Sequence, residues 1–299
     1  MTSSFPQQRI ALPTGVELDV VVAGDPANPP VILLHGFPES HRTWRHQIPF
    51  LAQTHFLLAP DQRGYAKSSK PEGVEHYAPA KIVGDVLALA DHFGADRFTL
   101  IGHDWGGAAS WMTAINHPDR VERLVILNAP HPFIFQKTMF DDPDQRAASQ
   151  YIRAFRTPTI EAHIAKIGID AYFNTTFMRH SDPEKMSAEK PVYLEQWTQP
   201  GALTAMFNWY RASPIIVPAM DPAEEAAPAR PAFLSRPFPP MQMPVLMIWG
   251  LQDVALRPSQ LEGIEALVPE LTLVKVDAGH FVTWEAPDAV NAAMAAWLP

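Results

Sequence analysis

The sequence contains no cysteine, which excludes disulfide bonds, cysteine-ligated zinc and thiol catalysis. Charged residues make up only 18% of the chain, and 32 acidic residues outnumber 23 basic ones to give a net charge of −9. No run of basic residues offsets this excess, so we expect no binding to nucleic acid. No apolar stretch reaches the roughly 20 residues of a membrane span, and we expect no membrane partner.

Two further absences concern location. The amino-terminal residues lack a basic segment followed by an apolar core, so we expect no signal peptide. The lack of cysteine is compatible with a reducing compartment, and we expect a cytoplasmic protein.

The residues that are present describe a large globular domain. With 299 residues, 47% of them hydrophobic, the chain is long enough for one α/β domain with an inserted subdomain. Short apolar segments alternate with helical patterns, as in a doubly wound, mostly parallel sheet. Eight strands are expected, at 9–12, 16–23, 31–34, 56–59, 98–101, 123–127, 244–249 and 271–276. Helices between and after them are expected at 44–53, 82–93, 259–267 and 287–297.

The alternation stops between the sixth and seventh strands. Helical patterns at 145–155, 160–173 and 201–212 follow one another with no strand between them, and a proline-rich tail at 218–240 is expected to be irregular. We therefore expect a helical cap at 132–240, inserted between a first core part at 1–131 and a second at 241–299.

The stretch 98–107 combines an apolar run with Gly102, a polar tip and further glycines before a helix begins. Such a sharp strand-to-helix turn pushes the side chain at its tip, here Asp104, into an active site. A carboxylate is an anion at neutral pH, and it can displace a leaving group from a saturated carbon to form an alkyl-enzyme ester. Water must then hydrolyse the ester with the help of a general base. The alternative is that Asp104 only caps the following helix.

Two residues after the cap complete a catalytic order of nucleophile, acid and histidine. Asp253 follows the seventh strand and His280 follows the eighth, so both are expected at the carboxyl edge of the sheet. We expect His280 to activate water while Asp253 orients its ring and stabilises the imidazolium. Asp277 is an alternative acid, although its place beside a turn favours turn chemistry. Asn128, after the sixth strand, is uncharged and cannot supply the negative charge that stabilises the imidazolium.

A second turn, at 35–38, follows the third strand. The backbone N–H groups of Phe37 and Trp105 are expected to form an oxyanion hole for the carbonyl of Asp104. The alternative is a tight turn without a catalytic role. The remaining histidines show no pairing typical of a metal site, and His41 and His46 are expected at the surface.

These motifs resemble the epoxide hydrolase branch of the α/β-hydrolase superfamily. The matching stretches are HGFPES at 35–40, DQRGYAKSSKP at 61–71, GHDWGG at 102–107 and AGHFVTWEAP at 278–287. The resemblance covers the whole chain. It implies an α/β-hydrolase fold that converts an epoxide to a vicinal diol without a cofactor or metal.

Relatives in this branch carry two cap tyrosines that donate a proton to the opening epoxide. The resemblance implies that Tyr210, within the run FNWYR, and Tyr151, a few residues before a proline, fill these roles. Tyr172 and Tyr193 are weaker candidates, and each tyrosine could instead be a packed core residue. Substrate contacts are expected from these two tyrosines and from His35, Phe37, Trp105 and Trp209, whose aromatic character favours an apolar substrate.

Two alternatives remain open at this stage. Haloalkane and haloacetate dehalogenases share the aspartate nucleophile, but Phe37 and Trp105 stand where those enzymes usually carry asparagine and arginine respectively. A non-catalytic small-molecule receptor on the same fold is the second alternative. The expected partners are a small-molecule substrate and water, and a homodimer stays open.

Overall fold

The computed structural model describes residues 5–177, 186–221, 223 and 228–299. Its eight strands form one sheet in the order β1-β2-β4-β3-β5-β6-β7-β8. Only β2 runs antiparallel to its neighbours, and all other adjacent pairs are parallel. The strands are β1 (Gln7–Ala11), β2 (Glu17–Ala23), β3 (Pro30–Leu34), β4 (Phe56–Pro60), β5 (Phe98–His103), β6 (Val121–Leu127), β7 (Val245–Gly250) and β8 (Leu271–Val276). The predicted sheet is confirmed, with each strand end within about two residues of its expected place.

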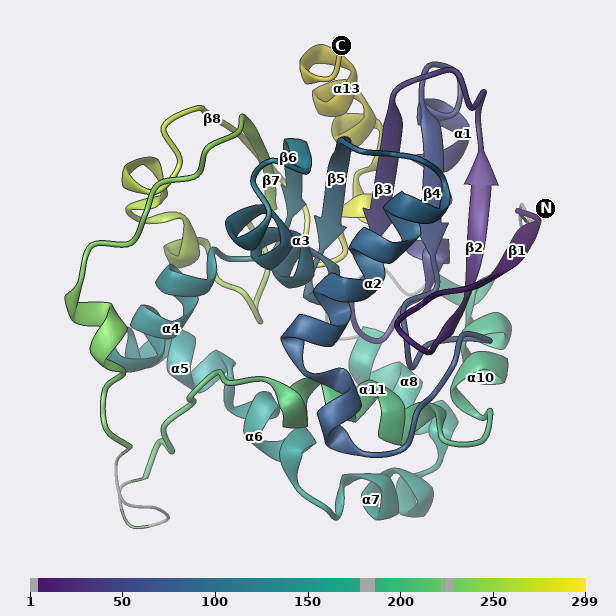
Figure 1. Cartoon of the computed structure of the whole chain (residues 1–299). Coiled ribbons are helices and arrows are strands. Elements are labelled where there is room, and N and C mark those ends of the chain that lie inside the picture. The colour runs from purple at the N-terminus through teal and green to yellow at the C-terminus, as the bar shows by residue number, and fades with distance from the viewer. Residues whose placement is uncertain (1–4, 178–185, 222, 224–227) are drawn as a thin grey trace.

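Helices cover both faces of the sheet. Alternate side chains of β3 face opposite ways, so Ile32 packs into one apolar cluster and Leu33 into the other. The first cluster includes residues of α2 (Pro79–His92) and α3 (Trp105–Asn116), which lie in front of the sheet in Figure 1. The second includes residues of α1 (Ile48–Leu51) and α13 (Pro287–Trp297), behind it. Burial of each such aliphatic side chain contributes roughly 1.5–3 kcal/mol.

The segment between β6 and β7 carries only helices and irregular structure in its described residues. Figure 1 shows α6, α7, α8, α10 and α11 gathered at one end of the sheet. The helices are α4 (Pro132–Asp141), α5 (Pro143–Ala148), α6 (Gln150–Arg156), α7 (Ile160–Ile167), α8 (Ile169–Phe177), α10 (Lys190–Trp197), α11 (Ala202–Ala212) and the 3-10 turn η3 (Ala232–Ser235). The helices expected between the sixth and seventh strands are therefore present, and we refer to this segment as the cap. Its boundaries at 132 and 240 stay a prediction.

Several helices differ from their expected extent. The helix expected at 160–173 divides into α7 and α8 because Gly168 adopts φ = 89°, which ends α7. The helix expected at 44–53 is replaced by η1 (His41–Trp44) and the short α1, since Pro49 cannot donate a helical hydrogen bond and lies in the first turn of α1 instead. The stretch expected at 259–267 forms two 3-10 turns, η4 (Pro258–Leu261) and η5 (Ile264–Ala266).

The remaining differences are smaller. The pattern at 145–155 forms α5 and α6, which meet at Ser149. Five of the described elements had no prediction: α4, α10, the 3-10 turns η2 (Val74–Tyr77) and η3, and the one-turn α12 (Val282–Glu285). Within the described ranges, no helix has the length and apolar character needed to cross a bilayer.

Helix α10 fastens the cap to the loop after β3. Tyr193 Oη donates to Glu39 Oε1 over 3.0 Å, and Trp197 Nε1 donates to the carbonyl of Pro38 over 2.9 Å. Arg42, buried in η1, forms a bidentate ion pair with Glu189 at the start of α10. The loop that carries Phe37 is therefore held by the cap as well as by the sheet.

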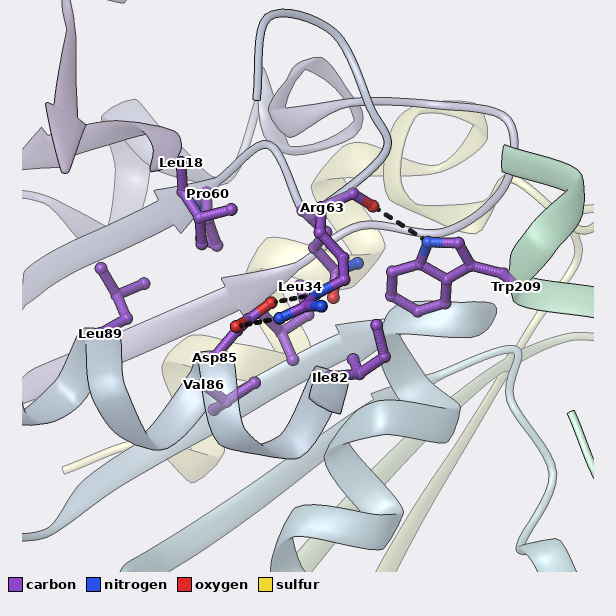
Figure 2. A pocket seen from close by; sticks show the side chains of 10 residues that line it. Leu18, Leu34, Pro60, Arg63, Ile82, Asp85, Val86, Leu89 and Trp209 are labelled. Atoms are coloured by element: carbon purple, nitrogen blue, oxygen red, sulfur yellow. Dashed lines mark hydrogen bonds and ion pairs between the residues drawn. The ribbon is translucent and has the colours of Figure 1, made fainter. Parts of the chain in front are cut away.

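Helix α11 is fastened through Arg63, in the loop after β4. Figure 2 shows Trp209 Nε1 pointing at the carbonyl of Arg63, to which it donates over 3.0 Å, and the Arg63 guanidinium lying against Asp85 of α2. The guanidinium donates to both carboxylate oxygens, over 2.5 and 2.6 Å, and the two side chains are only 2% and 7% exposed. This buried pair holds the core loop whose Arg63 carbonyl binds the helix that carries Tyr210.

We expect Asp85→Asn to destabilise the protein by about 3–5 kcal/mol, because it leaves the buried Arg63 charge without its partner. The measurement is the free energy of unfolding from denaturant titration. The control is Asp144→Asn, which breaks an exposed pair with Arg257, 78% and 45% exposed. Such a pair contributes about 1 kcal/mol at most. Equal losses in the two variants would contradict a special role for Arg63–Asp85.

Candidate active site

Asp104 lies at the turn between β5 and α3. Its backbone adopts φ = 50° and ψ = −121°, a conformation that costs about 1–3 kcal/mol for a residue other than glycine. Its side chain makes no capping hydrogen bond to α3, so it does not serve as the cap considered from the sequence. The carboxylate is instead 11% exposed and lines a cavity under the cap.

The loop after β3 brings a donor to this carboxylate. The Phe37 N–H donates to Asp104 Oδ1 over 2.7 Å, and the Trp105 N–H also acts on the same carboxyl group and lowers its pKa. Gly36 makes this approach possible, since a Cβ atom there would lie 2.4 Å from Asp104 Cβ. The two N–H groups expected to form the oxyanion hole thus converge on Asp104.

His280 connects Asp104 to Asp253. Its Nε2 lies 3.6 Å from Asp104 Oδ2, and its Nδ1 lies 2.7 Å from Asp253 Oδ2. The other oxygen of Asp253 accepts the N–H groups of Ala255 and Leu256, each over 2.9 Å. The three residues predicted from separate strand ends therefore meet at one site.

The alternative acid, Asp277, has a different hydrogen-bond partner. It is exposed, and its carboxylate accepts a hydrogen bond from Gln252 Nε2 over 2.6 Å. The structure thus separates the two acids: Asp253 contacts the imidazole, and Asp277 takes part in a surface turn.

Asn128 holds Asp253 in place, a role that the sequence did not reveal. Its backbone has φ = 39°, its Nδ2 donates to Asp253 Oδ2 over 2.8 Å, and its Oδ1 accepts the Gly250 N–H over 2.8 Å. The signal in the sequence was a polar residue directly after a buried strand, although its amide gave no sign of the bond to Asp253.

Asp104, His280 and Asp253 shift one another's pKa values. Burial raises the pKa of Asp104, and His280 and the two N–H donors work against that rise. Burial alone would lower the pKa of His280, but Asp253 and Asp104 outweigh it and raise that pKa to about 9. Burial also disfavours ionised Asp253, yet His280 and hydrogen bonds hold the pKa of Asp253 below its usual range. Each carboxylate therefore favours the imidazolium, and the imidazolium favours the ionised form of both carboxylates.

A cavity of about 420 Å³ opens above Asp104. Its wall is largely aromatic and aliphatic, with Phe37, Phe155 and Phe281 among its residues. A second, apolar cavity of about 50 Å³ lies beside it and is lined by Trp105, Ile152 and neighbouring residues. Asp104, Tyr151 and Tyr210 line both cavities, so they lie where the two meet.

Tyr151 of α6 and Tyr210 of α11 lie together in this wall, with ring centroids 6.1 Å apart. Burial raises the pKa of both hydroxyls, and negative groups that include Asp104 raise it further. Both tyrosines therefore keep their protons at neutral pH. Tyr172 lines the same cavity, whereas Tyr193 is bonded to Glu39.

Comparison with known proteins identifies the family. The model of the α/β-hydrolase fold matches residues 29–287. Epoxide hydrolase A of Mycobacterium tuberculosis is 31% identical over 98% of this chain and 97% of its own length. The chain belongs to the epoxide hydrolase family of the α/β-hydrolases.

Two other relatives extend the similarity. The AB hydrolase superfamily protein YfhM of Bacillus subtilis is 36% identical over 93% of this chain and 92% of its own. A solved structure described as "Novel epoxide hydrolases belonging to the alpha/beta hydrolases superfamily in metagenomes from hot environments" is 47% identical over 99% of both chains, with a TM-score of 0.89.

His35 and Trp209, two of the substrate contacts predicted for this member of the epoxide hydrolase family, do not line the large cavity. His35 is fully buried, and its Nε2 accepts the Gln62 N–H over 3.0 Å, which fixes the loop after β4. Trp209 packs on Trp105 and Tyr65, and its indole N–H donates to the carbonyl of Arg63. Both residues lie near the site, but their side chains are used in contacts that support the surrounding loops.

His41 was expected at the surface together with His46, but the structure places it differently. His41 is only 6% exposed and contacts Asp61 over 2.9 Å, whereas His46 is exposed as expected. In the described part of the chain, no three histidine or acidic side chains are grouped so that they could hold a metal ion.

We expect Gly36→Ala to lower activity by about a hundredfold or more, because the new methyl group overlaps Asp104 and displaces its carboxylate. The measurement is kcat/KM for an epoxide such as styrene oxide. The control is Gly84→Ala in α2, where the added Cβ meets only Thr14 Cγ2 at 3.6 Å. Unchanged kcat/KM in Gly36→Ala would contradict the close approach of this loop to Asp104.

Proposed function

We propose that the protein converts an epoxide to a vicinal diol through a covalent ester on Asp104. The observation that supports this most is that one cavity wall holds the Asp104 carboxylate and two protonated tyrosines, with His280 behind the carboxylate. Its largely apolar wall favours an epoxide with apolar substituents.

In the first step, a carboxylate oxygen of Asp104 attacks one epoxide carbon. The bond between that carbon and the epoxide oxygen breaks, and the oxygen takes a proton from Tyr151 or Tyr210. The products of this step are an ester, a free hydroxyl group and a tyrosinate, and the His280 imidazolium then returns a proton to the tyrosinate.

In the second step, neutral His280 takes a proton from water, and the hydroxide attacks the ester carbonyl of Asp104. The N–H groups of Phe37 and Trp105 stabilise the resulting oxyanion. The tetrahedral intermediate expels the diol oxygen, which takes the proton of the new hydroxyl group, and Asp104 is left as a carboxylate. Ester formation prepares this step, since it removes the Asp104 charge that raises the pKa of His280.

The dehalogenase hypothesis involves the same first bond but a different leaving group. A halide leaves as an anion and needs hydrogen-bond donors rather than a proton, so two protonated tyrosines above the nucleophile favour an epoxide. The receptor hypothesis involves binding without any bond formation. Both differ from our proposal in the mass of the protein after mixing with substrate.

We expect His280→Gln to accumulate the ester, because glutamine cannot activate water, a function that contributes about 10²–10⁴-fold. The measurement is intact mass after mixing with styrene oxide. An increase by the whole substrate mass supports an ester from an epoxide, since ring opening expels no group. A haloalkane adduct would lack the mass of the halogen.

The control for this experiment is His163→Gln, which replaces an exposed histidine of α7 and should not accumulate the adduct. Multiple turnovers by His280→Gln without any adduct would contradict the proposed cycle. Binding of the epoxide with neither adduct nor diol would favour the receptor.

We expect the double variant Tyr151→Phe, Tyr210→Phe to lose epoxide opening by about 10²–10⁴-fold, since no acid remains to protonate the departing oxygen. The measurement is the single-turnover rate of ester formation, with the melting temperature as a check of folding. The control is Tyr77→Phe, because Tyr77 donates to the carbonyl of Pro71 and does not line the cavity. Rates like those of the unmodified protein would exclude these tyrosines as proton donors.

A further inference from the structure

The loop that carries His280 is held by a carboxylate on the next helix turn. Glu285, half-buried at the end of α12, accepts the Gly279 N–H at Oε2 over 2.5 Å and the Phe281 N–H at Oε1 over 3.3 Å. These two N–H groups belong to the residues on either side of His280. A single side chain thus bonds the backbone before and after it.

The carbonyl of His280 is held from the opposite direction. His103, the last residue of β5 and fully buried, lies with Nε2 2.8 Å from that carbonyl oxygen. Three consecutive residues, 279–281, therefore have backbone groups fixed by two side chains from different elements. The imidazole of His280 is oriented by Asp253 at Nδ1, whereas its backbone is positioned by Glu285 and His103.

We propose that Glu285 is a positioning residue for the hydrolytic half of the cycle: by holding the backbone on both sides of His280, it keeps Nε2 directed at the ester on Asp104. This inference rests on the proposed function, since it assigns Glu285 to the ester-hydrolysis step alone. Ester formation uses the Asp104 carboxylate and the tyrosine hydroxyls, whereas the Glu285 bonds described above go to the loop that carries His280.

Glu285 also contributes to the electrostatics of His280. The charged or titratable groups that face the imidazole are Asp253, Asp104, Glu285 and the neutral His103. The Glu285 carboxylate favours the imidazolium and helps raise the pKa of His280. Loss of that charge lowers the pKa of His280, so the acid limb of ester hydrolysis, which needs neutral imidazole, moves to lower pH.

A merely structural role predicts a different result. Carboxylates often bond free N–H groups at the start of a helix, and α12 is a single turn whose first N–H groups need acceptors. If Glu285 only stabilised this turn, its replacement would lower the melting temperature but would not change one half-reaction more than the other.

The test uses Glu285→Gln, which keeps one acceptor oxygen but removes the charge and turns an amide group toward a backbone donor. Rapid quench and intact mass with styrene oxide give the rate constants of ester formation and ester hydrolysis across the pH range. We expect hydrolysis to slow by about 10–100-fold, ester formation to change by less than about twofold, and the acid limb of hydrolysis to move to lower pH. The ester then accumulates during steady turnover.

Two further variants separate charge from geometry. Glu285→Asp keeps the charge but is too short to reach both N–H groups, so it should restore the acid limb while hydrolysis stays slow. Glu262→Gln, at an exposed position, is the matched control and should behave like the unmodified protein.

The inference is overturned if Glu285→Gln leaves hydrolysis unchanged, or slows both half-reactions by the same factor. If Glu285→Gln fails to fold by thermal melting, Glu285→Asp decides, and normal hydrolysis in that variant overturns the inference. Failure of the proposed function has a different signature, because His280→Gln would then form no ester at all.

Discussion

A carboxylate that must stay ionised in a buried place is the constraint on which the rest of the structure depends. Asp104 lies at the tip of a turn whose backbone is strained, under a cap and away from bulk water. Burial raises its pKa, and the His280 imidazolium and the N–H donors that converge on it work against that rise. These come from loops at the carboxyl edges of β3, β5 and β8, which only a parallel sheet brings to one edge.

In the proposed cycle, the same arrangement lets His280 take two roles in sequence. While Asp104 is charged, the imidazole is its counterion, and the hydrogen bond to Asp253 stabilises that state. Once Asp104 becomes an ester, one of the two negative neighbours is gone and the ring becomes a base. Asp253 can support both states because its own oxygens are bonded by Asn128 and by backbone N–H groups, and so its position does not depend on the charge of His280.

The parts of this site that follow from local pattern could be predicted from the sequence. Asp104, Asp253 and His280 each follow a strand, and a parallel sheet determines where strand ends meet. Side-chain direction is decided by tertiary packing, so the sequence placed His35 in the cavity wall, although it bonds Gln62 instead. His41 was expected at the surface for the same reason, because nothing local marks its contact with Asp61.

Helix extent and supporting contacts were less accessible from the sequence. The expected helix at 160–173 looked continuous by apolar spacing, and only the backbone angle of Gly168 divides it. Asn128 acts through contacts to Gly250 and Asp253, which are more than a hundred residues away, and no spacing rule connects them.

The attachment of α10 and α11 to the core has a consequence for how substrate enters the cavity and how product leaves it. To lift the cap would break the hydrogen bonds to Pro38 and Arg63 and would pull on the loop that carries Phe37. Val254 lines the large cavity and is also 56% exposed, so it marks the mouth. We therefore expect the epoxide to enter and the diol to leave past Val254 by motion of side chains. The cap would stay in contact with the core throughout the catalytic cycle.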